Sequence, residues 1–96
     1  IRQTQASQDC LMNVVFTGAA WSDYLYWQAE DRKTLKKIND LIKVIKRFPY
    51  EDLGKPEPLR HQLQGNWSRR IDIEHRLVYK VEDRRKLVTI ACRYHY

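Results

Sequence analysis

The sequence predicts an α+β domain of the element order β-α-α-β-β-β, with two N-terminal helices packed on one face of a mainly antiparallel sheet. A length of 96 residues suits one domain. Apolar residues recur at helical spacing in the first half of the chain, and they alternate with polar residues in the last third. A proline-containing stretch separates the two patterns, which indicates helices first and a sheet afterwards.

The helical half opens with a short strand. Val14–Phe16 is β-branched and aromatic, and Thr17 can cap a following helix. The aromatic residues of that helix have helical spacing, which favours core packing or a dimer surface over a base-stacking platform. Asp31 can cap a second helix, which ends before Pro49. The first helix carries Trp21, Tyr24, Tyr26 and Trp27, and the apolar stripe of the second consists of Leu35, Ile38, Leu41, Ile42 and Ile45.

The second half predicts a loop and three strands. All three prolines fall within 49–63, the long loop, and long loops in small domains are often functional. The strands are expected over Trp67–Ile73, Leu77–Val81 and Leu87–Tyr94, with a charged turn at 82–85. In the last strand, Val88, Ile90, Cys92 and Tyr94 are expected on one face.

Residues 1–11 are polar and aperiodic, so we expect a flexible N-terminal extension before a single domain at 12–96. That leader contains no hydrophobic run of the secretory type. Cys92 lies in an apolar run, where it is expected as a small buried hydrophobe in a reducing compartment. These features predict a cytoplasmic protein.

The charge is the most informative bulk property. A formal net charge of +6 and a pI near 9.5 favour polyanionic partners such as nucleic acid, an acidic protein or an anionic membrane. A membrane is disfavoured, because no apolar run approaches the ~20 residues that a span needs. A solvated basic surface without a partner is the alternative.

Metal chemistry is not indicated. His61, His75 and His95 lack the spacing of a zinc site, and the cysteines form no C-x-x-C pair. The three glycines are too scattered for a phosphate loop. We therefore expect neither a metal nor another cofactor.

The remaining chemistry is acid, base and arginine. Cleaving RNA without a metal needs a base for the 2′-OH proton, an acid for the 5′-oxygen, and cations for the phosphorane. Glu57 lies between Pro56 and Pro58, which restrict its backbone and make it a candidate general base. An exposed loop glutamate with rigid neighbours is the alternative.

Several cations could bind phosphate. Arg69, Arg70 and Arg76 lie on or beside adjacent predicted strands, where a guanidinium can bind phosphate in a bidentate manner. Lys55 and Arg60 flank Glu57 in the loop. Simple surface charge is the alternative for all of them.

The C-terminus is unusual because the strand pattern ends on aromatic residues and a histidine. His95 titrates near physiological pH and is a candidate general acid. Tyr96 could stack on an unpaired base or donate to phosphate. A fraying terminus is the alternative reading.

Five segments resemble one known family, the YoeB toxins among the RelE-like mRNA interferases of bacterial toxin–antitoxin pairs. The resemblance covers Met12 to Tyr96, and the segments are specific because all occur in the same order. They are Trp21–Gln28, Gly54–Leu59, Trp67–Ile71, His75–Tyr79 and Cys92–Tyr96.

The resemblance implies a ribosome-dependent endoribonuclease that cleaves mRNA in the A site of the 70S ribosome. Glu57 then corresponds to the general base, His95 to the general acid, Arg76 to the cation on the scissile phosphate, and Tyr96 to the tyrosine that orients the substrate. Arg70 matches a further phosphate contact, and Arg60 stands where the family commonly has a lysine.

The resemblance also implies partners. These are a second copy of the chain, an acidic YefM-like antitoxin that folds over the site, and operator DNA bound only through the antitoxin. A different class of function is a non-catalytic basic binding module, acting through the antitoxin or on another target. The joint presence of Glu57, Arg76, His95 and Tyr96 favours the enzyme, and the same residues would also serve a ribonuclease independent of the ribosome.

Overall fold

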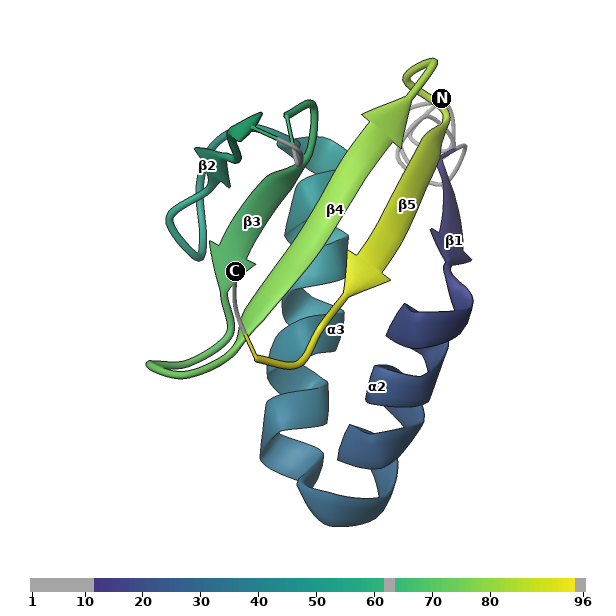
Figure 1. The fold of residues 1–96 in the computed structure, drawn as a ribbon, viewed down its shortest axis with the longest axis vertical. Helices are drawn as coiled ribbons and strands as arrows, with labels where there is room; N and C mark the ends of the chain where they lie inside the picture. The colour runs from purple at the N-terminus through teal and green to yellow at the C-terminus, as the bar shows by residue number, and fades with distance from the viewer. Residues whose placement is uncertain (1–11, 62–63, 95–96) are drawn as a thin grey trace, which may run out of the picture.

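The computed structural model describes residues 12–61 and 64–94. Within them the chain forms a first strand, two helices and four further strands, in the order shown in Figure 1. The elements are β1 (Asn13–Phe16), α2 (Gly18–Glu30), α3 (Arg32–Arg47), β2 (Glu57–Pro58), β3 (Trp67–Arg70), β4 (Arg76–Glu82) and β5 (Lys86–Ala91).

The strands form a five-stranded sheet in the order β1-β5-β4-β3-β2. β1 is parallel to β5, and the other neighbours are antiparallel. In Figure 1, α3 passes behind β3 and β4 and covers that face of the sheet, and α2 lies beside α3, below β1. The face toward the viewer, called the open face below, carries no helix. The predicted α+β architecture with a mainly antiparallel sheet is confirmed.

Both predicted helix caps are present. The Thr17 hydroxyl accepts from the Ala20 N–H at 3.1 Å and donates to the Ile90 carbonyl at 3.0 Å, which joins the start of α2 to β5. The Asp31 carboxylate accepts from the N–H groups that open α3. Neither described helix is long and apolar enough to cross a membrane.

The core lies between the helices and the covered face of the sheet. The stripe of α3 is confirmed, since Ile38, Leu41 and Ile45 are fully buried and Leu35 and Ile42 pack against them. β4 and β5 contribute Leu77, Tyr79 and Leu87 to the same cluster. Burial of these apolar side chains is the main source of stability for a domain of this size.

The strand boundaries differ from the expectation at three places. Strand β2 forms inside the predicted loop, because Glu57 and Pro58 pair with Ser68 and Trp67. Strand β3 ends at Arg70 rather than Ile73, because the Asp72 carboxylate accepts from the N–H groups of Glu74 and His75 and turns the chain. These local hydrogen bonds compete with the strand ladder.

The last strand is also shorter than expected. β5 ends at Ala91, so Cys92 and Tyr94 do not continue the alternation of Val88 and Ile90. The Cys92 N–H instead donates to the Asp23 carboxylate at 3.0 Å. This bond to α2 directs the chain away from the sheet.

The loop before β2 depends on a close approach at Gly54. Its φ of +89° is unfavourable for other residues, and an added Cβ would lie 2.8 Å from a Leu41 methyl and 3.1 Å from the Arg69 Cβ. The Gly54 carbonyl also accepts from the Arg70 N–H at 2.7 Å. Glycine at this position therefore lets the loop rest on β3 just before Glu57.

Replacing Gly54 with alanine is expected to lower the free energy of unfolding by about 1–3 kcal/mol, through strain at positive φ and contact with Leu41. Urea unfolding monitored by tryptophan fluorescence measures this. Gly18→Ala is the control, because Gly18 is at the start of α2 with open space around its Cα, and it should be neutral or stabilising. Equal stability of the two variants would contradict the role of Gly54.

Candidate active site

The pairing register brings the candidate base and two arginines onto the open face. Glu57 lies opposite Ser68, and Arg70 lies opposite Arg76. Directly opposed residues project to the same face, as do residues two apart in one strand. Glu57, Ser68, Arg70 and Arg76 therefore share one face of β2, β3 and β4.

Glu57 and Arg76 form the centre of this group. The Arg76 Nη1 lies 3.8 Å from the Glu57 Oε1, and the two side chains are 24% and 62% exposed. At this distance they attract one another without a tight hydrogen bond. A carboxylate and a cation held this close, with solvent access to both, can engage a phosphodiester between them.

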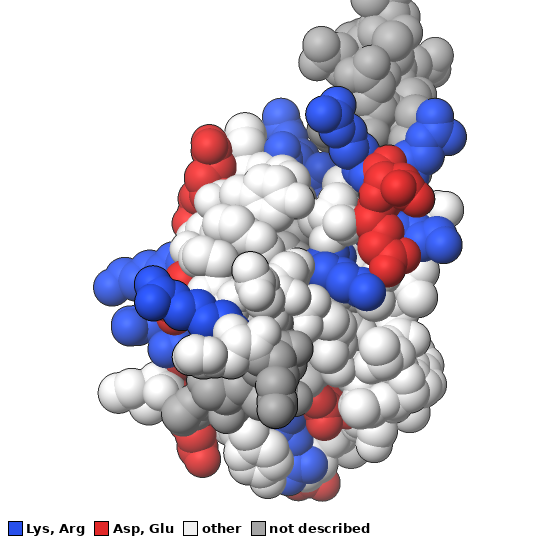
Figure 2. Space-filling model, turned by 45° about the horizontal axis from the view of Figure 1, so that its top comes forward, with Lys and Arg blue, Asp and Glu red and all other residues white. Residues whose placement is uncertain are grey.

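Of the other predicted cations, all except Arg69 are exposed. Lys55, Arg60 and Arg70 all lie on the surface. On the face shown in Figure 2, Lys and Arg side chains gather on the side of β2 and β3 and again around the β4–β5 turn, with uncharged residues between them. Arg76, and Arg70 opposite it in the sheet, bring positive charge to the side of Glu57, which suits phosphate.

The exception is Arg69, for which the predicted phosphate contact does not fit the structure. Its side chain is fully buried, because alternation along β3 directs it into the core. The guanidinium donates to the Tyr79 hydroxyl at 3.1 Å, to the Leu53 carbonyl at 2.7 Å and to the Phe48 carbonyl. Arg69 is thus a structural residue that holds the loop after α3.

Tyr79 completes this buried network. Its hydroxyl donates to the Pro49 carbonyl, and burial raises the pKa of the phenol, so it remains a neutral donor. Together Arg69 and Tyr79 bind three carbonyl groups of residues 48–53. Partly buried carbonyl groups need such donors, and only that of Phe48 has a further backbone donor in the described chain, the Glu51 N–H at 3.5 Å.

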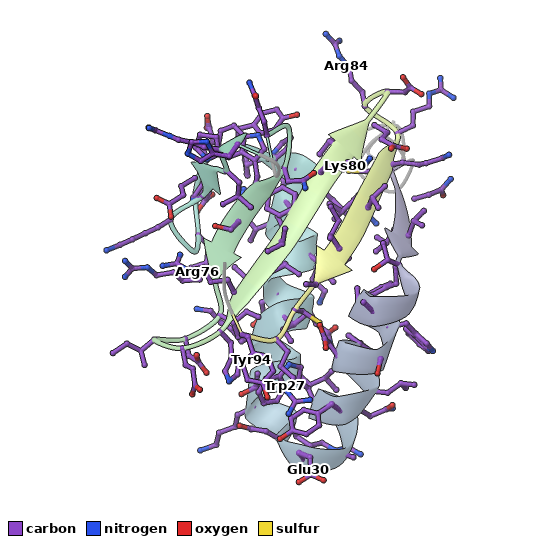
Figure 3. All side chains as sticks on the ribbon, in the orientation of Figure 1. Trp27, Glu30, Arg76, Lys80, Arg84 and Tyr94 are labelled. Carbon is purple, nitrogen blue, oxygen red and sulfur yellow. The ribbon has the colours of Figure 1, made fainter. Side chains whose placement is uncertain are left out.

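The predicted acid and the terminal tyrosine, His95 and Tyr96, lie outside the described residues. The described chain ends at Tyr94, whose carbonyl accepts from the Arg76 N–H at 2.8 Å. The end of the described chain therefore lies beside the arginine that pairs with Glu57, and Figure 3 shows Tyr94 close to Trp27.

The segment before Tyr94 is held by α2. The Trp27 indole N–H donates to the Cys92 carbonyl at 2.8 Å, and the Cys92 thiol is fully buried. Burial and the nearby Asp23 carboxylate raise the thiol pKa to about 12, so Cys92 is an unreactive thiol at neutral pH. The expectation of a small buried hydrophobe at Cys92 is confirmed.

Two residues near the site were not among the sequence candidates. Ser68 is 1% exposed, and its hydroxyl has no hydrogen-bond partner within residues 12–61 and 64–94. Alternation along β3 directs Arg69 to the core and places Ser68 on the same face as Arg70. Ser68 could therefore have been found from the strand pattern of the sequence. His75 contacts Tyr94 across the fold, and no local pattern predicts such a contact.

Among the residues that the structure describes, no three His, Cys, Asp or Glu side chains converge on one point.

Comparison with known proteins places the chain in a family. The family model of a "YoeB-like toxin of bacterial type II toxin-antitoxin system" matches residues 16–96. Toxin YoeB of Escherichia coli K12 is 56% identical over 85 residues, which are 88% of this chain and 100% of the relative.

Solved structures agree. A YoeB/ParE toxin from Agrobacterium tumefaciens superposes with a TM-score of 0.86 and 49% identity, covering 88% of this chain and 100% of that one. The YoeB dimer from Staphylococcus aureus gives 0.83 and 47%, covering 90% and 99%. The heterotetrameric YoeB–YefM complex from the same organism gives 0.82 and 48%, covering 88% and 98%.

Fold and comparisons first define the class, a RelE-like toxin of a bacterial type II toxin–antitoxin system. Within that class, the chain belongs to the family of YoeB-like toxins.

Mutation of the two adjacent arginines of β3 should change the free energy of unfolding to very different extents. Arg69→Met leaves carbonyl acceptors without donors and is expected to lower the free energy of unfolding by about 2–4 kcal/mol. Arg70→Met changes an exposed residue and should change stability by less than about 0.5 kcal/mol. Thermal and urea unfolding of both variants test this, and an Arg69→Met protein as stable as the wild type would contradict the structural role.

Proposed function

We propose that the chain is a metal-independent endoribonuclease that cleaves mRNA in the ribosomal A site and thereby inhibits translation in the cytoplasm. The observation that carries this proposal is the Glu57–Arg76 pair on the open face, 3.8 Å apart and accessible. Membership of the YoeB-like toxins supports it. A pure binding surface has no need for a carboxylate base beside a phosphate-binding arginine.

In the proposed reaction, the Glu57 carboxylate takes the proton of a 2′-hydroxyl. The 2′-oxygen forms a bond to phosphorus, and the bond from phosphorus to the 5′-oxygen breaks. The His95 imidazolium gives its proton to that leaving oxygen. The products are a 2′,3′-cyclic phosphate and a 5′-hydroxyl end, so protons and bonds balance.

The cations have a separate task. Arg76 stabilises the negative charge that develops on the phosphorane, and Arg70, opposite it in the sheet, assists. Lys55 and Arg60 hold flanking phosphates, and Tyr96 orients the substrate at the cut. Arg69 has no part in this, because it is buried.

The same surface suits a protein inhibitor. An acidic YefM-like antitoxin could neutralise the cations around Glu57 and exclude RNA from it. The complex of the S. aureus relative with YefM and the dimer of that relative support an antitoxin and a second copy as partners. Operator DNA would then be contacted only through the antitoxin.

The first test is primer extension on a defined mRNA with and without translating ribosomes. We expect cuts at an A-site codon only when ribosomes are present. A deoxynucleotide that removes the attacking 2′-hydroxyl should abolish cleavage. Cleavage of that deoxy substrate would exclude the proposed mechanism, and no cleavage of any RNA by folded, antitoxin-free protein would favour the non-catalytic binding module.

The roles of Glu57 and His95 have their own test. Glu57→Gln and His95→Gln should each reduce the single-turnover cleavage rate by about 10²–10⁴-fold, because each removes a proton-transfer step. Glu51→Gln and His61→Gln are matched controls, since both residues are exposed and lie outside the proposed site. Near-normal rates for the first pair would remove these residues from the roles assigned.

A further inference from the structure

The segment that leads into His95 is anchored on its backbone by several elements. The Trp27 indole holds the Cys92 carbonyl at 2.8 Å, and the Asp23 carboxylate holds the Cys92 N–H at 3.0 Å. Beyond them, the Tyr94 N–H donates to the His75 Nδ1 at 2.7 Å, and the Arg76 N–H donates to the Tyr94 carbonyl at 2.8 Å. The peptide groups around Tyr94 are therefore fixed before the chain reaches its last two residues.

His75 contacts the end of this segment and is itself held firmly. It is 8% exposed, and its ring lies edge-on to Trp27 with centroids 4.8 Å apart. The Asp72 carboxylate accepts from the His75 N–H at 2.7 Å, which fixes the backbone of the turn. The imidazole thus has a defined orientation toward Tyr94.

The bond to Tyr94 also fixes the tautomer of His75. A backbone N–H needs an acceptor, so Nδ1 must be unprotonated and the ring proton must be on Nε2. The Nε2 atom faces the Glu74 carboxylate at 3.7 Å. Only this neutral tautomer can accept from the Tyr94 N–H and so hold residues 92–94, called the tail below.

We propose that neutral His75 is a positioning residue: by accepting from the Tyr94 N–H, it fixes the backbone of the residue that immediately precedes His95, the proposed general acid. This inference rests on the proposed role of His95. Chain ends fray unless they are tied down, and a general acid must lie within hydrogen-bond reach of its target. Misplacement by about 1 Å can cost ~10²-fold in rate.

A second contact supports an anchored tail. The Arg93 guanidinium lies over the Tyr26 ring at 3.5 Å from its centroid and over the Tyr94 ring at 4.8 Å. These cation–π contacts hold side chains of the tail on the outside of α2. His75 differs from them because it acts on the backbone immediately before His95.

The matched variants are His75→Leu and His75→Asn. Both side chains branch at Cγ and have similar shape, but only asparagine carries an acceptor at the position of Nδ1. In single-turnover cleavage on ribosomes programmed with a defined mRNA, the leucine variant should react about 10–100-fold more slowly with unchanged binding of the ribosome complex. The asparagine variant should react close to the wild-type rate.

A change of leaving group identifies the step affected. An mRNA with sulfur in place of the 5′-oxygen at the scissile bond releases a thiolate, which needs no proton from an acid. On this substrate, both His75→Leu and His95→Ala should react at the wild-type rate. A His75→Leu protein that remains slow, or an asparagine variant as slow as the leucine variant, would overturn the positioning role.

The controls separate this inference from the proposed function. If His95→Ala stays slow on the sulfur substrate, His95 is not the acid, and the positioning role falls with it. If His95→Ala recovers but His75→Leu does not, only the inference about His75 fails. Should His75→Leu not fold, as judged by circular dichroism, His75→Gln replaces it, because its amide lies one carbon farther along and cannot accept at the Nδ1 position.

Discussion

The buried guanidinium of Arg69 is the interaction on which the rest of the site depends. It binds carbonyl groups of residues 48 and 53 and the hydroxyl of Tyr79, and so fixes the loop that leaves α3. Burying a cation is costly unless its donors are satisfied, so this hub forms only when loop and sheet are both in place. Gly54 then rests on β3, and Glu57 enters the sheet opposite Ser68, with its carboxylate 3.8 Å from the Arg76 guanidinium.

The two sides of the site are thus built from different parts of the fold. Glu57 reaches the open face through the loop after α3, whereas Cys92 and Tyr94 are held by α2 and by His75 in the turn before β4. Arg76 lies between them, since its side chain faces Glu57 and its backbone holds Tyr94. Rigid elements therefore hold the backbones of both Glu57 and Tyr94, although the Glu57 side chain is exposed. Such support favours a defined position for an exposed side chain.

The exposure of Glu57 bears on how the proposed activity would be inhibited. A solvent-accessible carboxylate among cations can meet a bulky substrate such as an RNA within a larger assembly, and it can equally be covered by an acidic peptide. Under the proposed function, one surface would serve both activity and inhibition, because RNA and an acidic peptide would compete for the same positive charge.

The sequence by itself determined the fold class, the helix caps at Thr17 and Asp31 and the α3 stripe, because caps and periodicity are local properties. It also singled out Glu57 and Arg76 as candidates. Only the tertiary structure decided that Arg69 faces the core while Arg70 faces the open side, and that β2 forms within the loop. Likewise, the His75–Tyr94 bond joins residues 19 positions apart, and such contacts depend on packing that no local pattern records.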